Sequence, residues 1–172
     1  MQTVIVVYSR TGNTLKVAKA LAGTLGAEIA VIRCQRNYEG AIGFLRGVVD
    51  SVMRHKPLID VAQFAAQPHD LMVIAGPIWA GRAAAPVMAF LAGRPKLPGR
   101  VALLLTHGGS NPAKALAEVE ALVSGPLAAR LALKEADIKG DRFSAPLGDF
   151  ARKAMGEVES HLIIGGSATR VA

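Results

Sequence analysis

The segment YSRTGNTLKVAKAL, residues 8–21, gathers small polar side chains around one glycine directly after an apolar run. The polar residues are Ser9, Thr11, Asn13 and Thr14, and the glycine is Gly12. A turn from a strand into a helix exposes several backbone N–H groups, and the helix N-terminus adds about half a positive charge. Gly12 would let the backbone curl into an anion-binding nest. The segment therefore predicts a site for a terminal phosphate, held without a lysine or a metal ion.

A simpler interpretation is an ordinary helix start, in which one serine or threonine acts as the N-cap. Capping accounts for one hydroxyl and not for the whole set, so the phosphate site is favoured. The turn lacks the lysine and the spacing of G-x-x-x-x-G-K-[ST], and it does not match G-x-G-x-x-G. No cysteine follows the first apolar run, and no carboxylate stands at residues 8–9 or 75–76. These absences exclude a thiol phosphatase and a magnesium-dependent receiver domain.

Two further loops carry residues that could contact a flat ligand. The loop GPIWAGR, residues 76–82, holds the only tryptophan, Trp79. A lone tryptophan is usually a packing residue, but a ring at the end of a strand could stack on a planar ligand for about 0.5–1.5 kcal/mol. The loop THGGSN, residues 106–111, has two glycines that permit close backbone approach. This loop is equally compatible with a tight connection, so the prediction depends on the three loops jointly.

These loops must be positioned by the elements around them. Continuous apolar runs predict buried parallel strands over Thr3–Val7, Leu71–Ala75 and Val101–Leu105. The mixed segment Glu28–Arg33 predicts an edge strand, and Leu131–Ile138 predicts a fifth strand.

Helical patterns lie between the predicted strands, and apolar residues mark their buried faces. These are Val17, Leu21 and Leu25 in the first helix, Ile42, Leu45, Val49 and Val52 in the second, and Leu147, Phe150, Ala154 and Val158 in the last. Pro86 opens a third helix through Phe90, and Pro112 opens a fourth through Leu122. The alternation predicts a doubly wound α/β domain with a parallel sheet. Ligands of such sheets bind beyond the carboxyl ends of the strands, where the three loops lie.

Composition narrows the class of protein. A chain of 172 residues fits one domain, which we place at residues 1–164 with a C-terminal tail at 165–172. The net charge is +7, but the basic residues are scattered without interleaved aromatic residues, which disfavours nucleic-acid binding. The single cysteine, Cys34, excludes an internal disulfide. No signal peptide and no apolar stretch of about 20 residues are evident, so we expect a cytoplasmic protein without a membrane span.

The sequence resembles the flavodoxin-like family, closest to its short-chain "flavodoxin family protein" branch. The segments that carry the resemblance are VVYSRTGNTLKVAKALA at 6–22, GAIGFLRGVVDSV at 40–52, DLMVIAGPIWAGRAAAPVMAFL at 70–91 and VALLLTHGGSNPAKAL at 101–116. The resemblance implies a three-layer α/β/α sandwich with a five-stranded parallel sheet in the order 2-1-3-4-5. It also implies noncovalently bound FMN.

The resemblance assigns site residues to all three loops. Ser9, Arg10, Thr11, Gly12, Asn13 and Thr14 would hold the FMN phosphate. Pro77, Ile78, Trp79, Ala80 and Gly81 would line one face of the isoalloxazine, and Thr106, His107, Gly108, Gly109 and Ser110 would border its pyrimidine edge. No metal is implied, and no catalytic residue is assigned.

Two departures from the family pattern bear on function. The third loop has no aromatic residue, which leaves one flavin face open to a hydride donor or a small acceptor. Flavodoxins are typically acidic, whereas this chain is basic, which weighs against a small electron shuttle.

The expected function is electron transfer or NAD(P)H-dependent reduction through FMN. An oxidoreductase of the NAD(P)H:quinone or flavin reductase type and a passive electron carrier both stay open. Expected partners are a redox protein or a small acceptor such as a quinone, with NAD(P)H as a donor, and either a monomer or a homodimer is compatible. The alternative is a non-redox binding module that keeps the fold without using flavin.

Overall fold

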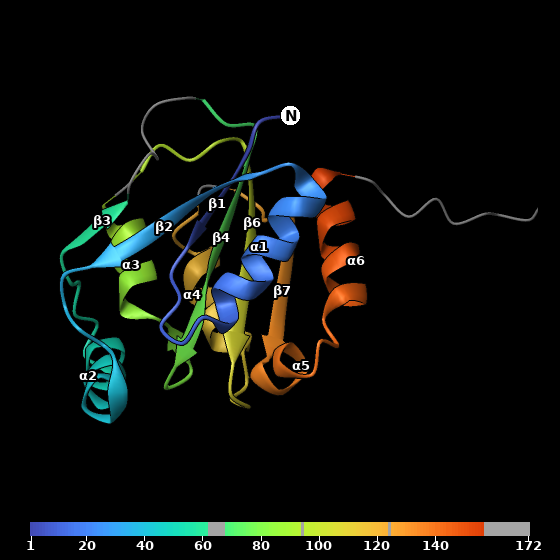
Figure 1. Ribbon diagram of the computed structural model, residues 1–172. Coiled ribbons are helices and arrows are strands. Elements are labelled where there is room, and N and C mark those ends of the chain that lie inside the picture. Colours follow the sequence, from blue (N-terminus) through green and yellow to red (C-terminus); the bar gives the residue numbers. More distant parts are fainter. Residues whose placement is uncertain (62–67, 94, 124, 157–172) are drawn as a thin grey trace, which may run out of the picture.

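The computed structural model describes residues 1–61, 68–93, 95–123 and 125–156, and it shows one sheet with helices on both faces (Figure 1). The strands are β1 Thr3–Val7, β2 Glu28–Cys34, β3 Ile59–Val61, β4 Leu71–Trp79, β5 Arg82–Ala83, β6 Arg100–His107 and β7 Ala129–Lys134. The helices are α1 Asn13–Leu25, α2 Gly40–Val52, α3 Ala85–Ala92, α4 Ala113–Glu120, α5 Glu135–Lys139 and α6 Ser144–Met155. Val158, the predicted domain end at 164 and the tail at 165–172 lie outside the described residues.

The sheet has the predicted parallel core. Its order is β3-β2-β1-β4-β6-β7, so the five parallel strands follow the order 2-1-3-4-5. Two short antiparallel strands were not predicted: β3 pairs with β2, and β5 pairs with β4. The prediction of Glu28–Arg33 as an edge strand is therefore wrong, because the end of β2 pairs with β3 through Ile32 and Val61.

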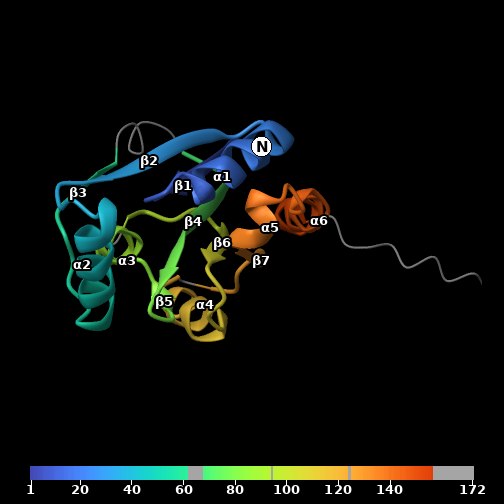
Figure 2. The same ribbon diagram turned by 60° about the horizontal axis from the view of Figure 1, so that its bottom comes forward.

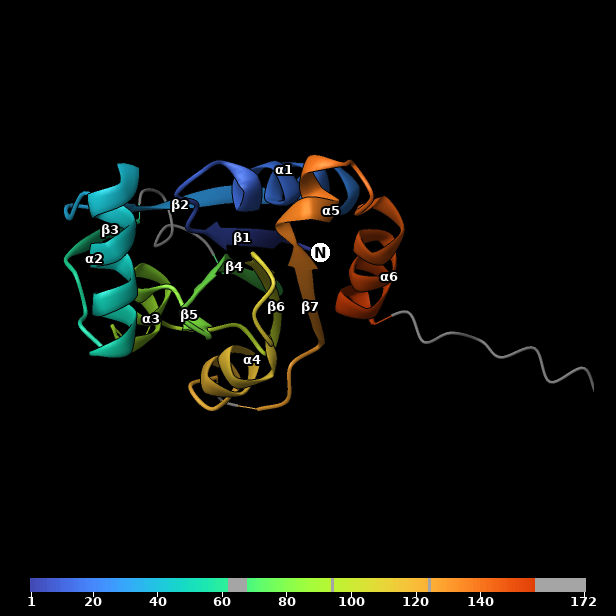
Figure 3. The same ribbon diagram turned by 90° about the horizontal axis from the view of Figure 1, so that it is seen from below.

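Two apolar layers enclose the sheet, which explains the continuous apolar runs of its strands. Val4 and Val6 of β1 belong to one buried cluster, and Ile5 and Val7 belong to the other. α1 and α6 cover one face of the sheet, while α3 and α4 cover the other (Figure 3). No helix in the described ranges is long and apolar enough to cross a membrane.

The fifth strand begins and ends earlier than predicted. It runs from Ala129 to Lys134, and the following residues form the short helix α5. Glu135 and Asp137 lie in the first turn of α5, where carboxylates interact favourably with the helix dipole. Ile138, which suggested a longer strand, is the buried residue of this helix instead.

α2 forms where predicted, but it faces the opposite way. Ile42 is 78% exposed and Leu45 is 64% exposed, and Val49 and Val52 are exposed as well. The buried positions of this helix are Gly43, Gly47, Asp50 and Ser51. α2 stands at one end of the sheet (Figure 2). Its predicted core face is exposed to solvent.

Close approach explains why α2 packs through its glycines. A Cβ atom at Gly43 would lie 2.2 Å from the carbonyl carbon of Tyr38, and one at Gly47 would lie 2.8 Å from the ring of Trp79. The backbone of α2 therefore lies directly against the loop after β2 and against the end of β4. A larger side chain would displace the helix at Gly43, and it would displace either the helix or the Trp79 ring at Gly47.

Candidate functional site

The first loop leaves hydrogen-bond donors free at the start of α1. Gly12 is the N-cap residue and has a φ of 87°, a left-handed conformation that favours glycine. No side chain caps this helix, so its first N–H groups, from Asn13 to Leu15, have no helical partner. The Ser9 Oγ atom is buried and has no hydrogen-bond partner within the described structure. Unpaired donors at a helix N-terminus form a ready anion site.

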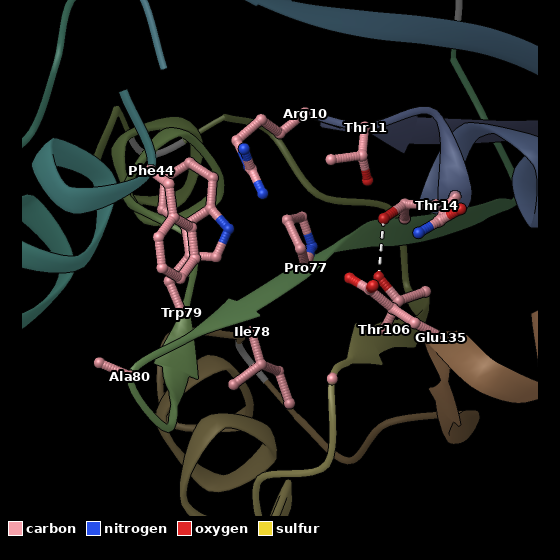
Figure 4. Close-up of a pocket in the computed structure, with 12 residues that line it drawn as sticks. Arg10, Thr11, Thr14, Phe44, Pro77, Ile78, Trp79, Ala80, Thr106 and Glu135 are labelled. Carbon is pink, nitrogen blue, oxygen red and sulfur yellow. Dashed lines mark hydrogen bonds between the residues drawn. The ribbon is translucent and has the colours of Figure 1, made fainter. Parts of the chain in front are cut away.

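The first and third loops meet directly. Thr14 Oγ1 and Thr106 Oγ1 share a buried hydrogen bond of 2.7 Å (Figure 4). One of these hydroxyls donates to the other, so one hydroxyl hydrogen remains available to a ligand. Pro77 lies opposite Thr106 in the ladder between β4 and β6, which brings the second loop to the same edge of the sheet. The predicted convergence of the three loops is therefore present.

A cavity of about 290 Å³ opens where the loops meet. Predicted residues that line it are Arg10, Thr11, Asn13, Thr14, Pro77, Ile78, Trp79, Ala80, Thr106 and Gly108. Phe44 and Glu135 also line it, and neither was predicted. The volume lies near the lower limit of ligand pockets, roughly 300 Å³. The cavity is thus large enough for one end of a cofactor, the remainder of which would extend along the protein surface.

The other predicted residues surround this cavity without lining it. Ser9 lines a neighbouring cavity of about 270 Å³ together with Tyr8 and Cys34. Gly12 supplies the bend before α1, and Gly81 lies in the turn after β4. His107 is buried at the end of β6, whereas Gly109 and Ser110 are exposed beyond it.

Trp79 forms a fixed wall of the cavity. Its side chain is only 5% exposed. The ring packs edge-on against Tyr8, with centroids 5.6 Å apart, and at a tilt against Tyr38, with centroids 5.1 Å apart. Most of the indole surface is therefore used in packing, and a small part borders the cavity. Stacking of Trp79 on a planar ligand stays a prediction.

A tight hairpin places Trp79 at this position. Trp79 pairs with Arg82, and the two residues between them, Ala80 and Gly81, have φ angles of 50° and 74°. Positive φ at both central residues is the pattern of the two-residue hairpin turn that suits the twist of paired strands. Ala80 adopts this conformation at some cost, because its Cβ atom disfavours the left-handed region.

Phe44 supplies an aromatic group that sequence reasoning missed. It extends from α2 and is 47% exposed, and the Arg10 guanidinium carbon lies 5.1 Å from its ring centroid. This distance lies within the range of cation–π contacts. The spacing of Gly43 and Gly47 could have revealed it. These glycines form the packed face of α2, and this orientation places Phe44 beside the first loop.

The cavity carries one positive and one negative side chain among its described lining residues, Arg10 and Glu135. Glu135 Oε2 lies 3.7 Å from Lys139 Nζ. Burial lowers the pKa of His107, and the charge of Lys134 lowers it further, so this imidazole is neutral at pH 7. Burial raises the pKa of Cys34, which keeps the thiol protonated at neutral pH and argues against a nucleophilic role.

Asp50 connects α2 to the aromatic wall of the cavity through hydrogen bonds. Its carboxylate is 2% exposed and accepts hydrogen bonds from Arg36 at 2.7 Å, from the Tyr38 hydroxyl at 2.8 Å and from His55 Nδ1 at 2.9 Å. Burial raises the pKa of this carboxyl, but the hydrogen bonds outweigh burial and leave the pKa below its usual value. Because Tyr38 also contacts Trp79, the carboxylate helps to fix the aromatic wall.

Comparison with known proteins identifies similar structures only. No protein-family model matches the sequence, and no curated protein matches it. A flavoprotein from Lactobacillus acidophilus in complex with FMN is 22% identical, with a TM-score of 0.64 over 83% of this chain and 98% of that chain. A WrbA-like flavodoxin from Agrobacterium tumefaciens is 16% identical, with a TM-score of 0.54 over 91% and 99%. An NADH:FMN oxidoreductase, EmoB, is 16% identical, with a TM-score of 0.58 over 94% and 92%.

Proposed function

Because this chain has the flavodoxin-like fold, we propose that it binds FMN at the meeting point of its three loops and serves in flavin-dependent electron transfer or reduction. The observation that carries the proposal is the uncapped start of α1 beside the bonded pair Thr14 and Thr106. There the backbone N–H groups and the free hydroxyl hydrogen suit a phosphate ester, and the unpartnered Ser9 Oγ lies in the same loop. Each hydrogen bond to a charged group contributes about 1.5–3 kcal/mol.

The remaining loop residues suit the ring of the cofactor. Ile78 and Trp79 give the cavity an apolar wall, and the exposed backbone of Gly108 permits close approach. Phe44 and Arg10 present flat surfaces beside the cavity, so they would contact the ring system or its side chain. In this proposal Pro77–Gly81 border the ring, and residues 106–110 border its polar edge.

When bound, FMN would supply the exchange of one or two electrons, and the chain would supply binding and orientation. The positive charge of Arg10 favours an anion in the cavity, whereas Glu135 opposes it. His107 is neutral and so adds no charge at pH 7.

An Asn13→Asp substitution tests the phosphate end of the site. It adds one negative charge to a cavity-lining residue while keeping the side-chain shape. We expect FMN affinity to fall by about ten- to hundredfold, because like charges repel at short range. Riboflavin lacks the phosphate, so its affinity should not change. Quenching of flavin fluorescence measures both affinities, and equal losses for the two ligands would contradict the proposal.

A Glu135→Gln substitution should have the opposite effect. Removing the carboxylate from the cavity is expected to tighten FMN binding by roughly threefold to tenfold and to leave riboflavin binding unchanged. Glu28→Gln is a matched control, because Glu28 is exposed at the start of β2, at the amino ends of the strands. An FMN affinity that does not respond to Glu135→Gln would place the phosphate elsewhere.

The absorbance spectrum of the isolated protein is the first test of flavin binding, because bound flavin gives a yellow protein. The similarity to an NADH:FMN oxidoreductase supports the reductase form of the proposal. NADH or NADPH oxidation by the flavin-loaded protein with a quinone, faster than with an equal amount of free FMN, would identify a reductase. Electron exchange only with a chemically reduced donor would identify a carrier.

A further inference from the structure

A second cavity lies apart from the candidate flavin site. It measures about 620 Å³ and shares no lining residue with the first cavity. It lies between the C-terminal end of α2, strand β5, and helices α3 and α4, all of which border one region in Figure 3. Its volume falls within the range of small-molecule sites, roughly 300–1,000 Å³. The cavity is therefore large enough to hold a compact organic ligand.

Apolar side chains make up half of the residues that line this cavity, and four of these are alanines. Ala83, Ala85, Ala92 and Ala121 line it, with Met88 and Leu91 beside them. Alanine at these positions leaves space that larger side chains would fill. Methionine is flexible and adapts to irregular shapes. This wall suits the apolar body of a ligand, such as an aromatic ring system.

Two buried polar atoms of the lining residues have no partner within the described structure: Ser51 Oγ and Glu118 Oε2. The other carboxylate oxygen of Glu118 lies 2.9 Å from the Arg82 guanidinium, and both side chains are largely buried. The ion pair therefore holds Glu118 in place while one oxygen stays unpaired. A buried polar atom without a partner is destabilising, because it has lost its hydrogen bonds to water. A ligand hydroxyl or amino group that donates to Glu118 would remove this destabilisation.

Positive side chains stand at the mouth of this cavity. Arg54 and Lys56 line it and are exposed, and neither forms a salt bridge with any described residue. The negative charges nearby are already matched, since Arg36 pairs with Asp50 and Arg82 pairs with Glu118. The two cations also suit the C-terminal end of α2, so they do not by themselves indicate a site. Together with the cavity and its unpaired atoms, they favour an anionic group at the entrance.

We propose that this second cavity binds a small amphipathic anion. The apolar body of the ligand would lie against the alanine wall, a hydroxyl or amino group would donate to Glu118, and an acidic group would lie between Arg54 and Lys56. This site is independent of FMN and goes beyond the function proposed above.

The probe for this site is 8-anilinonaphthalene-1-sulfonate, which combines two aromatic groups, one N–H donor and a sulfonate. Calorimetric titration of the full chain should show one bound equivalent, with the same affinity in the presence and absence of saturating FMN. Ala92→Phe fills the cavity and should abolish binding. Lys56→Glu, at an exposed position, should weaken binding by about tenfold. The same reversal at Lys19, an exposed residue of α1, is the control and should have no effect.

The exposed apolar face of α2 is the competing location for the probe. Leu45→Lys disrupts that face without touching the cavity, so binding should persist in this variant. Loss of binding in Leu45→Lys, or full binding in both Ala92→Phe and Lys56→Glu, would overturn the proposal. Displacement of the probe at FMN concentrations that just fill the first cavity would overturn it as well, because the probe and FMN would then share one site.

Discussion

A Gly43→Ala substitution is expected to destabilise the protein by about 2–4 kcal/mol, because the new methyl group meets backbone atoms. The added Cβ atom would lie 2.2 Å from the carbonyl carbon of Tyr38 and 2.6 Å from its oxygen. Backbone atoms cannot move aside as the end of a flexible side chain can, so α2 itself must shift. The shift would lift the helix from Trp79, which lies against Gly47.

Two measurements follow the effect of this substitution. Urea denaturation gives the loss of stability, and emission of the single tryptophan reports whether the ring becomes exposed. Gly23→Ala is the matched control, because Gly23 is exposed in α1 and a Cβ atom there meets nothing within 4 Å. The control should stabilise the helix by about 0.5–1 kcal/mol. A Gly43→Ala variant as stable as the parent protein would contradict the packing of α2 described above.

An Asp50→Ala substitution should be at least as damaging, with an expected loss of about 3–5 kcal/mol. The carboxylate accepts hydrogen bonds from Arg36, Tyr38 and His55, and its removal leaves the buried Tyr38 hydroxyl without its acceptor. Tyr38 would lose its anchor beside Trp79, so weaker FMN binding should accompany the loss of stability. Asp60→Ala, at an exposed position of β3, is the control and should change stability by less than about 0.5 kcal/mol.

The Asp50 contribution should depend on pH with a defined sign. The hydrogen bonds hold the folded-state pKa of this carboxyl below its unfolded value. The contribution is therefore complete above the ordinary carboxyl pKa and disappears as pH falls through the lower folded-state pKa. The difference in unfolding free energy between the parent protein and Asp50→Ala should shrink between about pH 5 and pH 2. A difference that stays constant down to the lower pH would show that Asp50 does not stabilise the fold through its charge.

The central strands could be predicted from sequence because burial on both faces leaves a clear signal. β1 runs from Thr3 to Val7 as predicted, and β4 and β6 contain the predicted runs. The boundary after Lys134 could not be predicted, since Leu133 and Ile138 suit a strand and a short helix equally well. The strands β3 and β5 were missed because segments of three and two residues carry no periodicity.

The orientation of α2 was mispredicted because the rule that apolar residues face the core fails for this helix. Its buried face consists of glycines, a serine and a carboxylate, whereas its apolar residues are exposed. Gly43 and Gly47 indicated the opposite orientation, because small residues four positions apart in a helix mark the face that packs closely against its neighbour. The buried charge of Asp50 depends on partners from other segments, which no local pattern reveals.

The candidate site was predictable where it depends on the ends of neighbouring strands. Parallel strands bring their following loops to one edge, so Thr14 and Thr106 meet although the sequence separates them widely. Phe44 and Glu135 enter the cavity from α2 and α5, whose positions depend on tertiary packing. Sequence reasoning therefore predicted most of the residues that line the cavity and missed these two.

The contrast between α2 and the central sheet has a consequence for hydrogen exchange. Amide protons of β4 and β6 lie between two apolar layers and should exchange only when the whole domain unfolds. α2 keeps much of its own apolar surface in water even when docked, so its detachment newly exposes mainly the aromatic rings beneath it and the buried Asp50. Its amides should exchange through a local opening of lower free energy. Local opening of α2 would therefore remove Phe44 from the cavity, while the turn at the start of α1 keeps its structure.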